Sequence, residues 1–512
     1  RHSGKDQGRW VSTPIPRNAA PFTLAEVLAA TGGRVAVGAG DASARGVMTD
    51  SRGDVSGALF IALKGERFDA HHFLEQVARG GAAMALVEDP HPEIQGLLQI
   101  QVACTLTALG DLALAHRRRW DGLVVAVGGS AGKTTTKACV SRVLSELIPG
   151  GIHAQRGNLN NRIGAPMVLL GCDARHRVAV VELGTNLRGE VAELARISEP
   201  DIGVVTLIDF EHTEGIGDLD AIEAEEGDLF RGLKSDGVAV GNVDDTRVAR
   251  QLEQAASTGR AVESYGKAPT ARYRLLRREP VGVSGARLTA SRAGFGGEIE
   301  LRSSLLGYPG ALASVCAALV ADAVSARLGL PMPDPELFSR ALESSEVAEN
   351  GRLCARAMLD GALVLDDSYN SNPGSVLSSV AVARELAAER GGRVFAVLGE
   401  MLELGPLSER EHRRIGAELA QFGLASLIAV QGDAQFLAEE AAARGVSSVF
   451  VADAGQAVQA LQGKPTPEDV ILVKGSRGVK LERVVAALLA GTSSEPLGVH
   501  APGPANEGPS AP

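Results

Sequence analysis

The stretch Val124-Val125-Ala126-Val127-Gly128-Gly129-Ser130-Ala131-Gly132-Lys133-Thr134-Thr135-Thr136 decides what the centre of this chain folds into. Its apolar start predicts a buried strand, its glycines predict a turn, and the apolar spacing that continues to Leu147 predicts a helix. In such a turn, backbone N–H groups and the helix N-terminus approach phosphate oxygens, Lys133 adds a positive charge, and the Thr134 hydroxyl suits Mg²⁺. We therefore predict a phosphate-binding loop rather than an ordinary turn, although the strict loop pattern has glycine where Val127 stands. The predicted phosphate contacts are Gly128, Gly129, Ser130, Ala131, Gly132, Lys133, Thr134 and Thr135.

The composition favours a multidomain protein of a reducing compartment. The chain has 512 residues, and its 62 acidic against 51 basic residues give a formal net charge of -11. This balance disfavours a general nucleic-acid binder or membrane-surface protein. The 5 cysteines include no C-x-x-C pair, so neither a zinc site nor a disulfide framework is predicted. We expect no apolar run long enough to span a membrane and no signal peptide, and we expect a cytoplasmic monomer.

Strand-like and amphipathic stretches alternate along most of the chain, which predicts an α/β protein of three domains with mostly parallel sheets. The predicted boundaries give a small N-terminal α/β domain at 21–105, a central domain with the phosphate loop at 106–331, and a Rossmann-like C-terminal α/β domain at 332–490. Thr23 is predicted to cap the first helix. A loose tail at 1–20 and a disordered tail at 491–512 are expected from their polar, Pro and Gly content.

In the central domain, polar residues follow predicted parallel strands, where ligands bind in such sheets. Glu182 follows the strand at 178–181, and His212 comes shortly after the apolar run at 202–208. A carboxylate in that position favours an Mg²⁺ ligand over a solvated or capping role. For His212, a surface-loop histidine is an equally good interpretation.

Two further polar groups of the central domain have plain structural interpretations. Asn158, Asn160 and Asn161 suit a nucleotide or sugar, but asparagines also stabilise turns by themselves. An acidic run lies on a predicted helix, and such runs usually form a solvated face. Its members are Glu223, Glu225, Glu226 and Asp228.

The outer domains carry polar clusters of their own. In the first domain, Ser51 and Arg52 precede a strand-like run, and Lys64 and Gly65 follow it. These groups suit an anionic ligand, and a hairpin with solvated charges is the slightly favoured alternative. In the last domain, three clusters each follow a predicted strand and should therefore share one rim of a sheet. They lie at 366–373, 399–405 and 474–478.

Together these motifs resemble the muramyl (Mur) ligases of peptidoglycan synthesis, over roughly residues 21 to 490. The family's short phosphate loop Gly-Ser-x-Gly-Lys-Thr-Thr matches 129–135, which accounts for Val127. The last-domain motifs Asp-Asp-Ser-Tyr-Asn-x-Asn-Pro and Gly-x-Met-x-Glu-Leu-Gly resemble the branch that adds D-alanyl-D-alanine. The remaining matches begin at Asp50, Leu63, Asn158, Glu182, His212 and Lys474.

The resemblance implies an ADP-forming ligase that uses ATP and Mg²⁺ and joins D-alanyl-D-alanine to a UDP-N-acetylmuramoyl tripeptide through an acyl phosphate. It implies catalytic roles for Lys133, Glu182, His212, Glu226 and Arg352, the last at the γ-phosphate, and a ribose contact at Asp367. The implied metal ligands are Thr134, Glu182 and His212. In the family the first domain holds the UDP end of the substrate. The implied substrate-binding residues are Ser51, Arg52, Lys64, Gly65, Asn158, Asn160, Asn161, Tyr369, Asn370 and Asn372.

Two positions depart from the family pattern. Glu226 stands where the family usually has a carbamoylated lysine that helps to hold a second Mg²⁺, and a glutamate supplies that carboxylate directly. The stretch 307–313 lacks the asparagine that the family places near adenine, so the adenine contact is unassigned. The alternatives are a sibling amide ligase with another acceptor, such as a folylpolyglutamate synthase, and a silent paralogue that binds UDP-muramoyl peptide or ATP.

Overall fold

The computed structural model describes residues 14–65, 68–292 and 297–490, so the tail predicted at 491–512 and most of that at 1–20 lie outside the described residues. The chain divides into two compact units. The first unit contains Arg1–Gly128, Ile148–Val204 and Asp228–Ala239, and the second contains Gly129–Leu147, Val205–Gly227 and Val240–Pro512.

The N-terminal part of the first unit is a small sheet with helices. The strands have the order β2-β7-β6-β5-β4, with β4, β5, β6 and β7 parallel and β2 antiparallel to β7. Thr23 caps α1 and forms a capping box with Glu26, which confirms the predicted N-cap. The elements are β1 Pro21–Thr23, α1 Leu24–Thr31, β2 Arg34–Val37, β3 Ser43–Arg45, β4 Val47–Met48, β5 Leu59–Ile61, α2 Leu74–Arg79, β6 Met84–Val87 and β7 Leu98–Gln101.

The rest of the first unit holds parallel strands in the order β11-β8-β10-β9. β8 pairs with β10, and β10 pairs with β9, in parallel register, as the sequence predicts. A buried ion pair, 2.7 Å between Arg117 Nη2 and Asp201 Oδ2, joins α3 to the start of β11. The elements are α3 Thr105–Arg119, β8 Leu123–Gly128, β9 Ile152–Ala154, α5 Gly164–Leu170, β10 Val178–Glu182, α6 Glu190–Ser198 and β11 Ile202–Val205.

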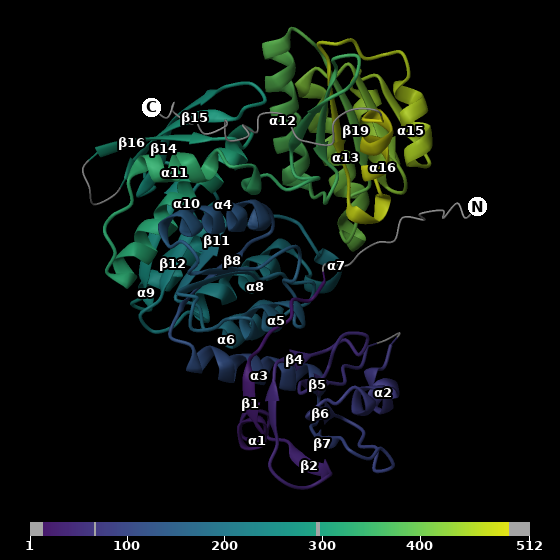
Figure 1. Ribbon diagram of the computed structural model, residues 1–512. Coiled ribbons are helices and arrows are strands. Elements are labelled where there is room, and N and C mark those ends of the chain that lie inside the picture. Colours follow the sequence, from purple (N-terminus) through teal and green to yellow (C-terminus); the bar gives the residue numbers. More distant parts are fainter. Residues whose placement is uncertain (1–13, 66–67, 293–296, 491–512) are drawn as a thin grey trace, which may run out of the picture. The chain divides into compact units, whose positions relative to one another are not determined.

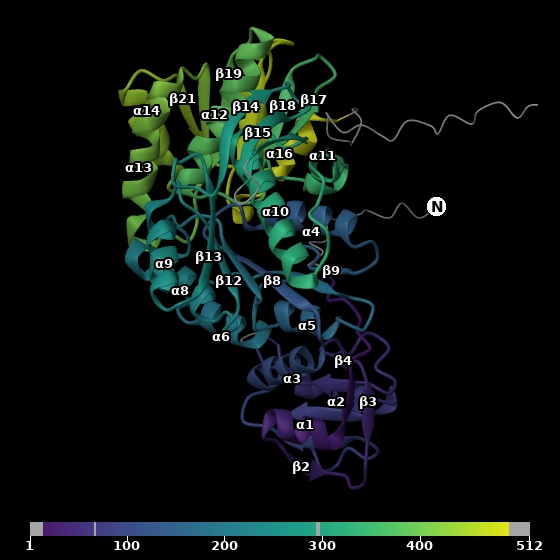
Figure 2. The ribbon, with the colours of Figure 1, turned by 90° about the vertical axis from the view of Figure 1, so that its left-hand side faces the viewer.

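In the second unit, strands follow the order β16-β15-β14-β13-β12, and β14, β15 and β16 are antiparallel. Helices α10 and α11 (Pro335–Leu342) of this unit pack against α4, the helix that follows the phosphate loop (Figure 2). The elements are α4 Lys133–Leu147, α7 Thr213–Ile216, α8 Leu219–Arg231, β12 Val238–Asn242, α9 Thr246–Ser257, β13 Ala261–Gly266, β14 Tyr273–Pro280, β15 Ala286–Arg292, β16 Gly297–Ser303 and α10 Gly307–Leu328.

Helix α10 corrects the expectation that no apolar run is long enough to span a membrane. An 18-residue window of this 22-residue helix has a mean hydropathy of 1.6, which meets that length and composition. However, 67% of this apolar window is buried, and α10 packs against α4 and β14. Its apolar character is explained by a position in the core of an α/β fold. Near its C-terminal end, Asp322 pairs with Arg292 at 2.7 Å in the interior.

The C-terminal part of the second unit is a sheet of order β17-β18-β22-β19-β20-β21, parallel except for β17. Alternate strand residues face opposite sides. One face packs on α12, α13 and α14, and the other packs on α15 and α16 (Figure 1). The elements are α11 Pro335–Leu342, β17 Cys354–Ala357, β18 Leu363–Asp367, α12 Pro373–Arg390, β19 Val394–Gly399, α13 Ser408–Leu419, β20 Ser426–Val430, α14 Ala434–Ala443, β21 Ser448–Val451, α15 Ala454–Leu461, β22 Val470–Lys474 and α16 Glu482–Leu488.

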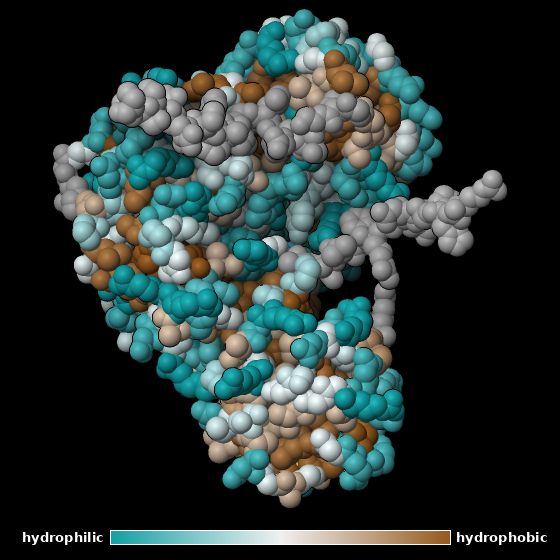
Figure 3. All heavy atoms as spheres, viewed as in Figure 1, coloured by the Kyte–Doolittle hydropathy of each residue, from teal (hydrophilic) through white to brown (hydrophobic). Residues whose placement is uncertain are grey.

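On the face drawn in Figure 3, hydrophilic residues cover most of the area, and hydrophobic residues form interrupted patches. Large apolar residues with high exposure, such as Leu359 at 77% and Leu187 at 57%, come from separate parts of the chain. Single exposed apolar residues are normal on folded proteins.

Candidate active site

The predicted phosphate loop is a turn between a buried strand and a helix. β8 ends at Gly128, and α4 begins at Lys133. Gly129 and Gly132 have φ angles of 113° and 83°, in the region that favours glycine. A Cβ atom on Gly129 would lie 2.3 Å from Thr206 Oγ1, so a larger residue would displace its neighbour. The strand–turn–helix arrangement is therefore confirmed.

The loop is held from one side by the segment that follows β11. The Ser130 N–H donates to the Leu207 carbonyl at 2.7 Å, and the Thr206 hydroxyl donates to the Ala131 carbonyl at 2.6 Å. The Asp209 N–H donates to Ser130 Oγ at 3.0 Å. At the start of α4, Thr134 is buried and Thr135 is partly exposed.

Two buried carboxylates face this loop. Lys133 Nζ donates to the Gly129 carbonyl at 2.5 Å and to Glu211 Oε1 at 3.1 Å. Glu226 Oε2 accepts the Gly129 N–H at 2.6 Å. Glu211 is 7% exposed and Glu226 is 1% exposed. The cationic loop is thus balanced by internal acidic groups that water scarcely reaches.

Burial raises the pKa of both carboxyl groups above the ordinary range. For Glu226 the pKa rises to about 7, because Lys133 and the Gly129 N–H offset burial only in part while Glu211 adds repulsion. Near neutral pH, Glu226 is therefore divided between its charged and neutral forms.

The expectation that the acidic run of α8 forms a solvated face is wrong. Glu223, Glu225 and Glu226 are 5%, 4% and 1% exposed. The helix turns this side inward because cations on neighbouring segments face it. Arg247 Nη1 lies 2.6 Å from Glu223 Oε2. Lys133 lowers the free-energy cost of burying the charged form of Glu226. Sequence spacing alone does not reveal those partners.

His212 connects the segment that follows β11 to the 399–405 cluster within the second unit. Its backbone has a φ of 49°, and its Nδ1 forms an ion pair with Glu403. Its Nε2 lies 3.9 Å from Glu211 Oε2. Burial alone lowers the pKa of His212, but Glu403 and Glu211 outweigh burial and raise it above its usual value. His212 is therefore not an ordinary surface-loop histidine.

Glu182 ends β10 within the first unit, in register with Val127 at the end of β8. It is 3% exposed. Its backbone N–H donates to Gln155 Oε1 at 2.7 Å, and its Oε1 accepts from Asn160 Nδ2 at 2.9 Å. The carboxylate is thus oriented by a neighbouring amide side chain.

The asparagines of the turn at 158–161 differ in which interpretation they fit, ligand binding or turn stabilisation. Asn160 contacts a predicted functional group, Glu182. Asn161 Oδ1 instead accepts the N–H groups of Ile163 and Gly164 at 3.1 and 2.8 Å, which stabilises the start of α5. Asn158 is exposed on the same turn.

The rim clusters of the C-terminal sheet do come together. Asp367 Oδ2 accepts from Lys474 Nζ at 2.7 Å, and Lys474 also donates to the Asn370 carbonyl at 2.8 Å. The Tyr369 ring lies 4.2 Å from the Arg352 guanidinium and 5.3 Å from that of Arg477. Asn372 caps α12 through a capping box, which is a structural task.

The first-domain cluster is open to solvent. Arg52 pairs with Asp50 at 2.6 Å, and its side chain is 87% exposed. Lys64 Nζ lies 3.8 Å from Asp89 Oδ2 and 4.0 Å from Asp69 Oδ2, and the Gly65 N–H donates to the Phe68 carbonyl at 2.8 Å. The Ser51 carbonyl accepts from Gln76. In the described residues the charges are solvated, as that alternative expects, but the strand between them is not part of a hairpin, because β5 pairs in parallel with β4 and β6.

Known proteins share both sequence and structure with this chain. Three family models match it: the Mur ligase family catalytic domain over 43–117, the Mur ligase middle domain over 127–321, and the Mur ligase glutamate ligase domain over 351–477. The UDP-N-acetylmuramoyl-tripeptide–D-alanyl-D-alanine ligase of Escherichia coli K12 is 34% identical over 444 residues, which cover 86% of this chain and 93% of that protein. The chain belongs to the Mur ligase family.

Other proteins similar to this Mur ligase support the same family assignment. The Bacillus subtilis ligase of the same name is 32% identical over 450 residues, covering 87% of this chain and 93% of that protein. The crystal structure of MurF from Acinetobacter baumannii has a TM-score of 0.79 at 29% identity and covers 93% of this chain and 100% of that one. The Thermotoga maritima MurF, solved in complex with ADP, shares the fold with a TM-score of 0.73 at 24% identity, covering 86% and 96% of the two chains. The mixed α/β architecture with mostly parallel sheets is thus confirmed.

In this Mur ligase, Glu211 is the residue near the phosphate loop that sequence reasoning missed. It adjoins the predicted His212 and lies 3.1 Å from Lys133, yet no charge pattern around it suggested burial. The closeness to a motif histidine was the available clue. A pocket lined by 207–209 and by residues of 242–247 was missed as well. It depends on the ends of β11 and β12, which lie far apart in sequence.

Proposed function

We propose that this Mur ligase joins D-alanyl-D-alanine to a UDP-N-acetylmuramoyl tripeptide, with ATP converted to ADP and phosphate, in the synthesis of peptidoglycan precursors. The observation that carries the proposal is the 34% identity over 93% of an Escherichia coli protein named for that reaction. The phosphate loop before α4 supports it, and so does the contact between Asp367 and Lys474 at the C-terminal rim.

The chemistry follows from the poor reactivity of a carboxylate toward amines. A carboxylate oxygen of the tripeptide attacks the γ-phosphorus of ATP, the bond to the β-γ bridging oxygen breaks, and ADP leaves with that electron pair. The amine of D-alanyl-D-alanine then attacks the acyl carbon, loses a proton, and expels phosphate. Because two anions meet in the first step, fixed positive charge and N–H groups supply most of the rate enhancement.

In the proposal Lys133 sits at the β- and γ-phosphates, and Gly128 to Thr135 supply N–H and hydroxyl groups. Lys133 must exchange its bond to Glu211 for phosphate oxygens on binding. Arg352 is proposed at the γ-phosphate and Asp367 at the ribose. Tyr369, Asn370 and Asn372 are proposed to contact the peptide part of the substrates.

Thr134 and Glu182 have the oxygen donors that Mg²⁺ prefers, and both are buried. By its chemistry each donor suits the ion and is proposed as a ligand, and His212 and Glu226 are proposed to support a second ion. When bound, Mg²⁺ neutralises phosphate charge. Glu211 and Glu403 keep His212 in place, and Asn160 orients the Glu182 carboxylate.

The remaining assignments are proposals of the same kind. The UDP end of the substrate would bind the first domain at Ser51, Arg52, Lys64 and Gly65. Asn158 and Asn161 would line the substrate path near Asn160. We retain the division at 21–105, 106–331 and 332–490, a cytoplasmic location and a monomeric state.

The test is phosphate release by the purified chain with Mg-ATP, UDP-N-acetylmuramoyl tripeptide and D-alanyl-D-alanine, each omitted in turn, with the product identified by mass. We expect release only with all three, together with a UDP-linked pentapeptide. Binding of the UDP-peptide without release would contradict the proposal and favour a silent paralogue. Release with a different amino-acid acceptor would favour a sibling ligase.

A further inference from the structure

Asp209 lies in the segment that follows β11 and contacts both the phosphate loop and the C-terminal sheet region. Its backbone N–H donates to Ser130 Oγ of the loop at 3.0 Å. Its side-chain Oδ2 accepts the N–H of Gly374 at 2.8 Å, in the first turn of α12. All three residues belong to the second unit. One residue thus connects the phosphate loop to α12 through two direct hydrogen bonds.

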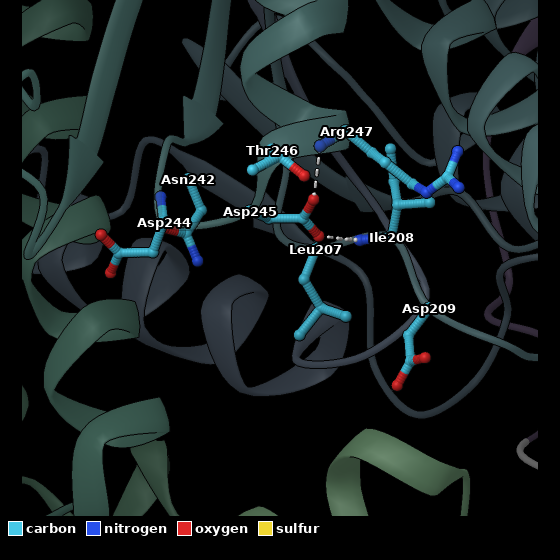
Figure 4. A pocket seen from close by; sticks show the side chains of 8 residues that line it. All are labelled: Leu207, Ile208, Asp209, Asn242, Asp244, Asp245, Thr246 and Arg247. Atoms are coloured by element: carbon cyan, nitrogen blue, oxygen red, sulfur yellow. Dashed lines mark hydrogen bonds between the residues drawn. The ribbon is translucent and has the colours of Figure 1, made fainter.

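The carboxylate of Asp209 serves this contact rather than the pocket that the residue borders. Figure 4 shows it pointing away from residues 242–247, which form the opposite wall. Its Oδ1 accepts the N–H of Phe210 at 2.8 Å, so both carboxylate oxygens have a partner. Burial raises the pKa of Asp209, and the N–H groups of Phe210 and Gly374 offset part of that rise. The first N–H groups of a helix have no partner within it, so an acceptor is favourable here.

The packing at Gly374 shows how closely the two segments approach. A Cβ atom on Gly374 would lie 2.2 Å from Asp209 Oδ2, well inside contact distance. An alanine at this position would therefore displace the carboxylate from its hydrogen bond. Alanine is a better helix former than glycine, so the intrinsic stability of α12 would not suffer. The contact can thus be broken from either side.

Helix α12 carries the rim cluster at 366–373 on its N-terminal end. Asn372 caps the helix through a capping box. The Ser379 hydroxyl, in the second turn, donates to Asp367 Oδ2 at 2.6 Å. These bonds fix the cluster to the helix, so a shift of the first turn of α12 shifts the proposed ribose contact Asp367 and the proposed substrate contact Asn372 with it.

The proposed reaction requires the phosphate loop and the rim cluster at a fixed separation. The γ-phosphate lies at the loop, and the carboxylate that attacks it must be aligned with the bond that breaks. A misplacement of about 1 Å can cost about a hundredfold in rate. The acyl phosphate must also be kept from water until the amine attacks. A residue that fixes the loop against α12 serves both needs without touching the substrate.

We propose that Asp209 is a positioning residue for ligation, which sets the place of the 366–373 cluster relative to the phosphate loop through Ser130 and Gly374. This inference rests on the proposed function. Position 209 belongs to none of the motifs that resemble the Mur ligases, since the nearest of them begins at His212.

The experiment is a double-mutant cycle of Asp209→Ala and Gly374→Ala, with phosphate release and UDP-pentapeptide formation measured separately at saturating substrates. We expect each single variant to lower the kcat of pentapeptide formation about tenfold to a hundredfold. The double variant should be no more than about twofold slower than the slower single variant, because both substitutions break the same bond. The KM of ATP and the calorimetric Kd of ADP should change less than about threefold, since the loop keeps its bonds to Thr206 and Leu207.

Two further readouts separate positioning from a loss of fold. The ratio of phosphate released to pentapeptide formed should rise from about one to about two or more in both single variants, because water hydrolyses a misaligned acyl phosphate. Asp209→Asn keeps a carbonyl oxygen for the Gly374 N–H, and its kcat should recover to within about fivefold of the wild type. Asp453→Ala is the matched control. It removes an aspartate N-cap from α15, on the opposite face of the C-terminal sheet, and should change kcat and the ratio less than about twofold.

Three outcomes overturn the inference and leave the proposed function intact. One is a kcat within about twofold of the wild type in Gly374→Ala or Asp209→Ala. Another is a double variant whose loss is the product of the single losses, which would show that the two residues act independently. The third is a lower rate with an unchanged phosphate-to-pentapeptide ratio in both single variants, which would assign Asp209 to folding alone.

Gly374→Ala carries the same test if Asp209→Ala does not fold, because it leaves the aspartate in the chain. A wild-type chain that forms no pentapeptide would instead remove the proposed function, on which the inference rests.

Discussion

The phosphate-loop cluster and the first-domain cluster both pair cations with carboxylates, yet they differ in burial. Lys133 has a side chain 13% exposed and faces Glu211 at 7%, whereas the Arg52 side chain is 87% exposed beside Asp50 at 46%. A buried pair carries a large desolvation cost, and removing one partner is expensive. An exposed pair contributes only about 0–1 kcal/mol. The loop is therefore held by buried contacts that are costly to break, whereas the first-domain pair is screened by water and contributes little to the fold.

Replacing Lys133 should produce the largest effect of the comparison. Lys133→Ala removes the phosphate cation and leaves Glu211 buried without its ion pair, so we expect turnover to fall at least about thousandfold and stability to fall by about 3 kcal/mol. Phosphate release measures the turnover, and thermal unfolding measures the stability. The exposed Lys464→Ala is the control. A near-normal rate in Lys133→Ala would remove the loop from the mechanism.

The pH dependence of stability should reveal the buried Glu226. Its pKa is raised from 4.5 to about 7, so the neutral form is favoured by folding. The stability that it contributes is fully present below pH 4.5 and is lost as the pH rises to about 7. Glu226→Gln keeps an acceptor for the Gly129 N–H. Its free energy of unfolding should therefore rise relative to that of the wild type over this range, and the difference should reach about 3 kcal/mol above pH 7.

Ligand-free protein is the sample for that measurement, by chemical unfolding at pH 5, 6, 7 and 8. Asp228→Asn is a suitable control because Asp228 lies on the same helix and its side chain is 27% exposed. A difference between Glu226→Gln and wild type that stays constant with pH would contradict the raised pKa.

The activities of Glu226→Gln and Glu225→Gln test whether Glu226 has a catalytic role that its neighbour lacks. Glu226→Gln should slow ligation about tenfold or more, and Glu225→Gln much less, because only Glu226→Gln removes the carboxylate that is proposed to support a second Mg²⁺ beside the phosphate loop. Rates at saturating ATP, combined with thermal melts, distinguish lost chemistry from lost folding. Equal and small effects would assign Glu226 to structure alone.

The first-domain cluster should show the smallest effect on the fold. For Arg52→Ala we expect a change in unfolding free energy below about 0.5 kcal/mol, since an exposed pair is screened by water. The KM for the UDP-peptide should rise about tenfold, because a charged hydrogen bond to the ligand is lost. Calorimetric titration with UDP tests the assignment, and Arg175→Ala, which removes a comparably exposed pair with Asp173, is the control. An unchanged UDP affinity would move the UDP site away from Arg52.

Local patterns predicted the elements well. The apolar run 124–127, the glycines and the helical spacing after Lys133 all act within a few residues, and β8, the turn and α4 follow them. The same holds for β18, β19 and β22, whose polar ends were expected at one rim and whose Asp367 and Lys474 do contact. Parallel pairing makes such rims predictable, because every strand ends at the same edge.

Burial of charge was not predictable in the same way. Glu226 and Glu223 belong to a run that composition assigns to solvent, yet Lys133 and Arg247 neutralise them across the fold. Whether an acidic helix face is wet or buried depends on which cations face it, and those come from remote segments. Asp209 is a similar case, since its carboxylate meets Gly374 from a remote part of the chain.

The sequence by itself determined the phosphate loop, the parallel strands, the family and the reaction class, because these depend on residue types at short and regular spacing. Only the tertiary structure decided that Glu211 holds Lys133, that Glu226 accepts the loop N–H, and that Asp209 accepts the N–H of Gly374. The physical reason is that desolvation and ion pairing depend on distance in space, and chain order does not specify which distant side chains share a dry environment.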